Sequence, residues 1–342
     1  MIIKHFQVTH LNQNPSSNFE FLFNQDINVL TGKNGAGKTT ILKLIWYLIS
    51  GNIDRMMTEG ARFKEIAIET NTFSLKIKIA DLISFQWNIG KGEQHHSVEA
   101  YKENGFFQFL NQEILKVSDT SIFFPTFRRM EGGFFTSERQ GHIYHALEKG
   151  VDNLSKDLSV RQHQFITSIS TDDIINFITR QYADVSEKNN EIQKQLARFI
   201  KELTTEKNAL HDIQLKTDEI TAKTDELFKP FTTLSKWVTE IFQSQGIKLT
   251  DNLTLGKAAN ALSSDKLSSG EKQMLSFLCY NAFYNQSIIF IDEPELSLHV
   301  DWQRTLFDTL MEQGTENQFF IATHSPFIYS QFPDKEIILG DE

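Results

Sequence analysis

Alternating apolar and polar positions predict strands in the first third of the chain. Residues 1–8 and 19–30 alternate in this way and are separated by a turn-forming segment of Asn, Pro and Ser, which predicts two strands. Residues 61–90 alternate similarly and predict an antiparallel extension of this part. Residues 91–116 carry no pattern that assigns an element. The beginning of the chain is therefore expected to be rich in strands.

Segments with helical spacing alternate with short apolar runs in the last third of the chain. Residues 272–281 and 302–312 have helical spacing, whereas 288–291 and 318–322 are continuous apolar runs. Short apolar runs between helices are typical of strands that are buried on both faces of a parallel sheet. Together with a predicted helix over residues 39–48, they indicate an α/β fold with a mixed or parallel sheet core.

The longest stretch without glycine or proline runs from Val151 to Lys229. Residues 163–169 still alternate like a strand, and one long helix is then expected from Asp172 until Pro230 ends it. Its 3,4-spaced positions are mostly apolar: Leu196, Phe199, Leu203, Glu206, Leu210, Ile213, Thr217, Ile220, Thr224 and Leu227. This seam predicts a short coiled coil, with an ordinary amphipathic surface helix as the alternative. The helix that pairs with it can belong to the same chain or to another protomer.

Charge and cysteine content narrow the class of protein. The 44 acidic and 34 basic residues give a formal net charge of −10, which argues against binding nucleic acid over the whole surface but leaves room for a local basic groove. The single cysteine, Cys279, fits a reducing compartment and is interpreted as a small buried hydrophobe. No signal peptide or membrane-spanning run is evident, because the apolar stretch near Ile41 is short and contains Lys43. We therefore expect a cytoplasmic protein that does not bind membranes.

A glycine-rich loop joins the second predicted strand to the helix over residues 39–48. Its sequence, Gly32-Lys33-Asn34-Gly35-Ala36-Gly37-Lys38-Thr39, fits the pattern G-x-x-x-x-G-K-[ST] at every defined position. Glycines let backbone N–H groups close around phosphate oxygens, and the helix N-terminus adds positive charge. Lys38 is expected to reach the β- and γ-phosphates of ATP, and Thr39 to ligate Mg²⁺. The other expected nucleotide contacts in this loop are Gly32, Asn34, Gly35, Gly37 and Thr40.

Acidic and histidine side chains follow the two apolar runs near the end of the chain. Asp292 and Glu293 follow the first run, and His324 follows the second. Parallel strands gather such positions at one edge of a sheet, where ligands bind. Asp292 is expected to hold Mg²⁺, Glu293 to polarise the attacking water as the catalytic base, and His324 to hydrogen-bond the γ-phosphate.

A second anion-binding helix start is predicted at Ser268-Ser269-Gly270-Glu271. A single nucleotide does not require two anion-binding helix starts from the same subunit. Ser268 and Gly270 are therefore expected to close over a nucleotide held by another subunit, which makes the chain a homo-oligomer, at least a dimer.

These four motifs, in this order, resemble the ATP-binding-cassette superfamily, and the resemblance covers roughly residues 1–50 and 250–330. It implies ATP hydrolysis to ADP and phosphate, with Ser268 and Gly270 acting in trans on ATP bound at Lys38 of the partner subunit. The phrase Asp292-Glu293-Pro294-Glu295-Leu296-Ser297-Leu298-His299 is similar to the SMC, RecF and overcoming-lysogenisation-defect branch. Transporter cassettes usually carry a different loop there, which disfavours a transporter.

That branch implies an ATPase head with an antiparallel β extension and a short helical coiled-coil insertion. The expected division is residues 1–150 for a first lobe with the glycine loop, 151–245 for the insertion, and 246–342 for a second lobe. Gln86 and Gln108 are both candidates for the glutamine that such heads place near the nucleotide.

The segment Phe123–Gly133 resembles ATPase subunits of PARIS-type and Septu-type anti-phage systems, in which a separate nuclease is paired with the ATPase. Arg128 and Arg129 can contact nucleotide, DNA or a protein partner, or form a solvated basic loop. Only residues 325–342 follow His324, so cleavage is expected to belong to another polypeptide. The first hypothesis is an ATPase that senses a trigger and holds or releases an effector; the second is a RecF-like ATPase that binds DNA in repair or recombination.

Overall fold

A computed structural model describes residues 1–59, 62–80, 82–89, 93–98, 104–126, 129–130, 153–169, 171–203, 209–241 and 267–340. Its contacts divide the chain into two compact units. The first unit consists of Met1–Ser168 and Tyr284–Glu342, and the second of Ile169–Phe283. The first unit therefore contains both the glycine loop and the acidic motif, although more than 250 positions separate Lys38 from Asp292 in the chain.

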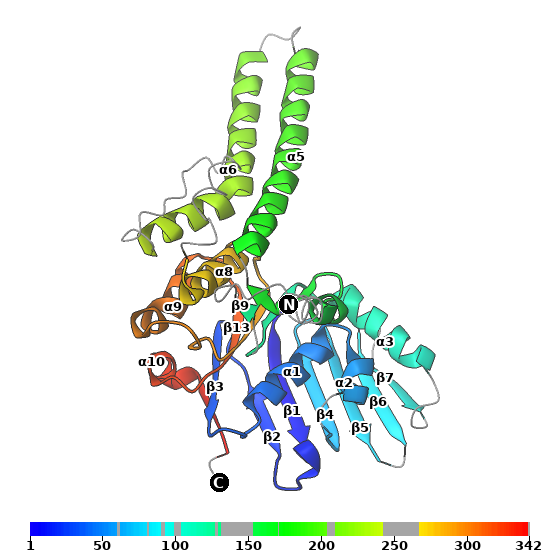
Figure 1. Cartoon of the computed structure of the whole chain (residues 1–342). Coiled ribbons are helices and arrows are strands. Elements are labelled where there is room, and N and C mark those ends of the chain that lie inside the picture. The colour runs from blue at the N-terminus through cyan, green and yellow to red at the C-terminus, as the bar shows by residue number, and fades with distance from the viewer. Residues whose placement is uncertain are drawn as a thin grey trace, which may run out of the picture. The chain divides into compact units, whose positions relative to one another are not determined.

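A parallel sheet lies in the first unit (Figure 1). Among the described residues its strand order is β10-β8-β12-β13-β3-β14, and every neighbouring pair is parallel. The strands are β3 Ile27–Gly32, β8 Ser121–Phe124, β10 His163–Phe165, β12 Ile288–Asp292, β13 Gln318–Ala322 and β14 Glu336–Leu339. All residues of β8, β12 and β13 are buried, as central strands of a parallel sheet require. The predicted parallel core is confirmed.

An antiparallel sheet forms the rest of the first unit's β-structure. Its described order is β2-β1-β4-β5-β6-β7, with β1 Ile3–Thr9, β2 Phe19–Leu22, β4 Glu65–Thr70, β5 Ser74–Ile79, β6 Ile83–Asn88 and β7 Glu93–Val98. Buried and less buried residues alternate along β4, β5 and β6, so one face of this part of the sheet packs on the core. The predicted antiparallel extension is confirmed, and part of the unassigned stretch 91–116 forms its last strand.

The prediction of one strand over residues 19–30 is wrong. The segment forms two strands, β2 in the antiparallel sheet and β3 in the parallel sheet. The side chain of Asn28 closes the turn between them, because its Oδ1 accepts from the Asn24 N–H at 2.7 Å and its Nδ2 donates to the Asn24 carbonyl at 3.0 Å. Alternation alone does not reveal that the two halves join different sheets.

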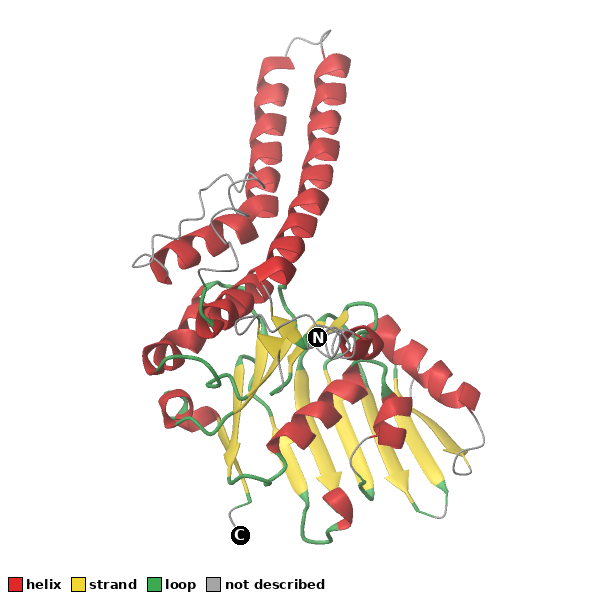
Figure 2. Ribbon diagram, in the orientation of Figure 1, coloured by secondary structure: helices red, strands yellow, loops and turns green. Residues whose placement is uncertain are grey.

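One hydrophobic core joins both sheets to helix α1, Lys38–Ile49. The buried Trp46 of α1 lies 5.8 Å from the ring of Phe123 and 5.3 Å from that of Phe165. Helix α2 (Ile53–Glu59) lies next to α1 and α3 (Asn104–Val117) next to α2 (Figure 2), and α9 (Val300–Glu312) and α10 (Pro326–Tyr329) follow β12 and β13 in the chain. This core fixes the glycine loop, which precedes α1, against the ends of the parallel strands.

The second unit contains a helix pair where a single helix was predicted. Helix α5 spans Thr171–Leu203, α6 spans Ala209–Ile241, and α8 spans Ser269–Phe283. Tyr182 of α5 contacts Phe228 and Phe231 of α6, and Thr224 Oγ1 donates to Asn189 Oδ1 at 3.0 Å. These contacts make the pair antiparallel, so the predicted seam pairs within the chain. None of the described helices is long and apolar enough to cross a membrane.

The expectation that Pro230 ends the helix is also wrong, since α6 continues to Ile241. A proline inside a helix costs about 3 kcal/mol. Beyond it, Leu234 and Val238 are fully buried and Phe231 nearly so, and burial of each such side chain contributes roughly 1.5–3 kcal/mol. Packing therefore outweighs the proline, and α6 bends along its length (Figure 1), as helices with internal prolines do.

His163, at the start of β10, is a buried histidine with two neutral partners. Its Nδ1 lies 2.8 Å from Ser121 Oγ and its Nε2 3.0 Å from Ser118 Oγ. Burial lowers the pKa of His163 from 6.5 to about 4, against the opposing effect of the Asp119 charge. The folded protein thus holds this imidazole neutral through a pH range in which the unfolded chain protonates it.

We expect this histidine to destabilise the fold as the pH falls from about 6.5 to about 4. In that window the unfolded state binds a proton that the folded state does not, which lowers the free energy of unfolding by up to about 3 kcal/mol. Thermal unfolding of His163→Gln, compared with the exposed-site control His211→Gln at each pH, measures this contribution. An unchanged pH dependence in His163→Gln would contradict it.

Candidate functional site

The glycine loop leaves β3 in a conformation that a side chain would prevent. Gly32 has φ 133°, and a Cβ there would lie 2.3 Å from the Leu339 carbonyl oxygen of the paired strand β14. Gly37 precedes α1 with φ 99°, and no side chain caps the helix there. The first turn of α1 is therefore a helix start of the kind that binds phosphate. Of the other predicted contacts, Asn34 and Gly35 are exposed and Thr40 is half-buried in α1.

Lys38 is buried at the first position of α1, with 6% of its surface exposed. Its Nζ donates to the carbonyls of Gly32 at 2.9 Å and Lys33 at 3.3 Å, and lies 2.8 Å from His324 Nε2. Because an ammonium group only donates, Nε2 accepts in this contact. Burial lowers the pKa of Lys38, and nearby carboxylates, Glu293 foremost, oppose that shift.

Asp292 is fully buried at the end of β12 and accepts hydrogen bonds on both oxygens. Thr39 Oγ1 donates to its Oδ1 at 3.0 Å, and Thr126 Oγ1 donates to its Oδ2. The sheet explains the convergence: Phe124 pairs with Ile291, so the segments after β8 and β12 leave the same edge side by side. The parallel register thus places a hydroxyl on each side of one carboxylate.

Glu293 adopts a left-handed backbone conformation, φ 50°, which is uncommon for a residue with a side chain. Its N–H donates to the Ala322 carbonyl at 2.8 Å, and its Oε1 lies 4.0 Å from His324 Nε2. Burial, followed by the charges of Asp292 and Glu295, raises the pKa of Glu293, against the opposing effects of His324 and Lys38. A carboxylate with a raised pKa is a better proton acceptor, as a general base requires.

Two site residues carried no predicted role. One is Thr126, on Asp292, and the other is Glu295, whose Oε2 accepts from Thr323 Oγ1 at 2.8 Å and whose Oε1 accepts from the His324 N–H at 2.7 Å. Each had a sequence signal, since Thr126 follows an apolar strand just as Asp292 does, and Glu295 lies in the phrase that marked the family branch.

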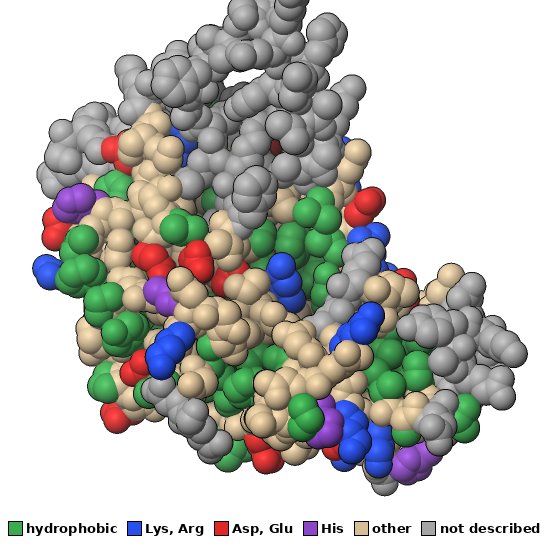
Figure 3. Space-filling view, turned by 60° about the horizontal axis from the view of Figure 1, so that its bottom comes forward, with side chains coloured by type: hydrophobic (Ala, Val, Ile, Leu, Met, Phe, Trp, Pro, Cys, Tyr) green, Lys and Arg blue, Asp and Glu red, His purple; other side chains and the backbone are tan. Residues whose placement is uncertain are grey.

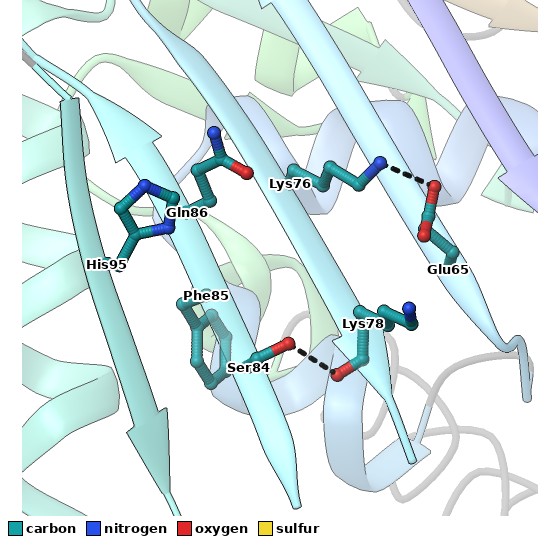
Figure 4. A pocket seen from close by; sticks show the side chains of 7 residues that line it. All are labelled: Glu65, Lys76, Lys78, Ser84, Phe85, Gln86 and His95. Atoms are coloured by element: carbon teal, nitrogen blue, oxygen red, sulfur yellow. Dashed lines mark hydrogen bonds and ion pairs between the residues drawn. The ribbon is translucent and has the colours of Figure 1, made fainter.

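The two glutamine candidates lie in other places. Gln86, on β6, lines a polar pocket on the antiparallel sheet together with Lys76, Lys78 and His95 (Figure 4). Gln108 is exposed on α3. Neither takes part in the contacts that the structure gives for Lys38 and Asp292.

Ser268 and Gly270 belong to the second unit, at the start of α8. The helix begins at Ser269, slightly before the predicted start at Glu271. Ser268 caps it: its N–H donates to Glu271 Oε2 at 2.5 Å, and the Glu271 N–H donates to Ser268 Oγ at 3.4 Å. This is a capping box, in which a serine and a glutamate three positions later satisfy each other's backbone N–H groups.

Of the other residues singled out from the sequence, Cys279 has a described side chain and the basic pair Arg128 and Arg129 does not. Cys279 is completely buried in α8, where burial raises the pKa of its thiol, which confirms its interpretation as a buried hydrophobe. Arg128 and the segment 131–133 lie outside the described residues, and of Arg129 only the backbone, in the strand β9 Arg129–Met130, is described.

The donor set at the end of the parallel sheet fits ATP with Mg²⁺. Mg²⁺ prefers carboxylate and hydroxyl oxygens, and Asp292 and Thr39 supply both within one hydrogen bond of each other. Phosphates bind to ammonium groups and to backbone N–H groups at helix starts, and Lys38 and the first turn of α1 supply these.

Comparison with known proteins agrees with this chemistry. The chain is 22% identical over 362 residues to the Retron Vc95 probable ATPase of Vibrio cholerae serotype O1 biovar El Tor, covering 93% of this chain and 69% of the relative. A shorter match, 37% identical over 75 residues, links 20% of this chain to 13% of Endonuclease GajA of Bacillus cereus strain VD045.

Among solved structures, similar chains include the Smc head domain bound to the C-terminal domain of ScpA from Pyrococcus furiosus, at 14% identity, with 96% of this chain and 91% of that chain covered and a TM-score of 0.40. RecF with ATP matches at 15% identity, 95% and 94% coverage and a TM-score of 0.36. A model of the AAA ATPase domain matches residues 12–329. Since that match spans well over half of the sequence, the chain belongs to the AAA ATPase domain family and is an ATPase.

Proposed function

We propose that this ATPase pairs with a second copy through composite nucleotide sites and that its ATP state controls a separate effector, such as a nuclease, in anti-phage defence. The observation that supports the pairing is that the two helix starts expected to bind phosphate belong to different units. One stands beside Lys38 and Asp292 in the first unit, and the other, at Ser268, begins α8 in the second.

Within one chain, Lys38 and His324 bind the γ-phosphate, and Thr39 and Asp292 hold Mg²⁺. When bound, Mg²⁺ neutralises negative charge that develops on the transferred phosphoryl group. Glu293 accepts a proton from the attacking water, which its raised pKa favours. Ser268 and Gly270 of the partner subunit then close the site over the nucleotide, as the resemblance to the ATP-binding-cassette superfamily implies.

A mixing experiment tests the composite sites. Lys38→Ala removes the phosphate contact, and Ser268→Asp keeps a good helix cap but places a negative charge next to the incoming phosphate. We expect each variant alone to be inactive. In a mixture, Lys38 of one copy and Ser268 of the other complete one site per mixed dimer, so roughly a quarter of the wild-type rate returns with random pairing in a two-fold dimer.

Ser268→Asn is the matched control, because asparagine also caps helices but carries no charge. It should hydrolyse ATP much faster than Ser268→Asp. Differently tagged copies verify that mixed oligomers form. Mixed oligomers that form and yet remain inactive would show that each chain completes its own site.

The effector and its biological setting rest on resemblance. The segment Phe123–Gly133 is similar to ATPase subunits of anti-phage systems, and the relatives are named as the probable ATPase of a retron and as an endonuclease. On the face shown in Figure 3, the described residues place basic and acidic side chains among one another, and their basic side chains form no continuous track for a DNA backbone. We therefore favour a protein effector over DNA as the partner.

A further inference from the structure

The loop that follows β12 is fastened to the loop that follows β13. Glu295 makes the first set of hydrogen bonds between these loops: its two carboxylate oxygens accept from Thr323 Oγ1 at 2.8 Å and from the His324 N–H at 2.7 Å. Thr323 is fully buried, whereas His324 is exposed. The Glu295 carboxylate therefore binds the backbone N–H of His324, just after the chain leaves the sheet.

Gln303, at the start of α9, makes a second set of hydrogen bonds between the same loops. Its Nε2 donates to the Leu298 carbonyl at 2.8 Å, and its Oε1 accepts from Ser325 Oγ at 2.6 Å. The Ser325 N–H donates to Thr323 Oγ1 at 3.0 Å, which links the hydrogen bonds of Gln303 to those of Glu295. Residues on both sides of His324 are thus held by side chains from the loop that carries Glu293 and from the helix that follows this loop.

This arrangement matters because the imidazole of His324 lies between the two groups that act on the phosphate and the water. Its Nε2 is 2.8 Å from Lys38 Nζ and 4.0 Å from Glu293 Oε1. The ring's position depends on its backbone, and the backbone N–H is held by Glu295. A small displacement of a positioned group is enough to slow a reaction, because catalytic geometry must be held closely.

We propose that Glu295 is a positioning residue that holds His324 in place for ATP hydrolysis through two hydrogen bonds. This inference rests on the proposed role of His324 at the γ-phosphate. The two hydrogen bonds of the Glu295 carboxylate go to the Thr323 hydroxyl and to the His324 N–H. Its hydrogen bonds act on the geometry of His324, whereas its charge is a separate contribution to the raised pKa of Glu293 that ranks behind burial and Asp292.

Two substitutions separate geometry from charge. Glu295→Gln removes the charge but keeps the length: its amide oxygen accepts from the His324 N–H, and its amide nitrogen donates to Thr323 Oγ1. Glu295→Asp keeps the charge but is one methylene shorter, so it cannot reach both donors. We expect Glu295→Asp to lower kcat about 10–100-fold with little change in KM for ATP, and Glu295→Gln to stay within about threefold of wild type.

Hydrogen exchange at the His324 amide gives a readout that does not depend on activity. In the full-length protein without nucleotide, exchange should be at least about tenfold faster in Glu295→Asp than in wild type, and near wild type in Glu295→Gln. Glu312→Asp and Glu312→Gln, at an exposed site on α9, are the matched controls.

The opposite ranking, with Glu295→Gln impaired and Glu295→Asp normal, would show that charge acts and would overturn the proposal. Unchanged exchange of the His324 amide in Glu295→Asp would overturn it as well. If the wild-type protein failed to hydrolyse ATP, the proposed mechanism of hydrolysis would fail, but the exchange comparison would still decide whether Glu295 holds the His324 backbone.

Discussion

Glu293→Gln is expected to bind ATP normally and to hydrolyse it about 10²–10⁴-fold more slowly than the wild-type protein, because an amide cannot accept the proton of the attacking water. The substitution preserves the size of the side chain. It also removes a charge from a group whose pKa is raised by burial and by two neighbouring carboxylates, so it does not weaken the fold. Without hydrolysis, the closed ATP-bound oligomer should accumulate. Steady-state phosphate release and light scattering with and without ATP measure the two effects.

Glu312→Gln, the same change at an exposed position of α9, should hydrolyse ATP at the wild-type rate. Wild-type turnover in Glu293→Gln would assign the base to another group. The trapped oligomer can also be used to capture an effector. A protein that copurifies with Glu293→Gln in a different amount than with the wild type supports control of the effector by the ATP state.

Lys38→Ala should abolish measurable ATP binding, with affinity weakened by at least about 100-fold, because charge-assisted hydrogen bonds contribute roughly 1.5–3 kcal/mol each. Contacts with two loop carbonyls and with His324 Nε2 hold Lys38 Nζ beside the glycine loop. Its ammonium is therefore preorganised for phosphate. Titration calorimetry with Mg²⁺ and ATP measures the loss.

Lys43→Ala is the matched control, since Lys43 lies on the same helix but is exposed. It should bind ATP with wild-type affinity. Circular dichroism of Lys38→Ala verifies that the buried site still folds without its cation. Unchanged affinity in a folded Lys38→Ala protein would remove the glycine loop from the nucleotide site.

Local chemistry made the main site residues predictable. The glycine loop needs positive φ values and an open helix start, and only a few residue types provide them, so Gly32, Gly37 and Lys38 stand out in the sequence. Asp292 and His324 were predictable for another reason, because Asp292 ends one fully buried strand and His324 closely follows another at the binding edge of the sheet. The contacts among Lys38, Thr39, Asp292 and His324 agree with those expectations.

Thr126 and Glu295 show where this reasoning stops. Both side chains act through residues far along the chain, Thr126 through Asp292 and Glu295 through Thr323 and His324. Their sequence signals, a position after an apolar strand and a place in a family motif, do not identify the distant partner. Only the strand register, which sets neighbouring strands side by side, makes these pairs.

The sequence by itself determined the class of fold, the family motifs and the nucleotide chemistry, because these depend on local periodicity and on residue types with few alternatives. Tertiary structure alone decided where helices and strands break. Pro230 stays inside α6 because buried side chains beyond it outweigh its cost, and residues 19–30 divide because their halves pack in different sheets. The pairing of α5 with α6 within one chain was likewise decided by packing, since their polar and apolar positions also suit a partner in another copy.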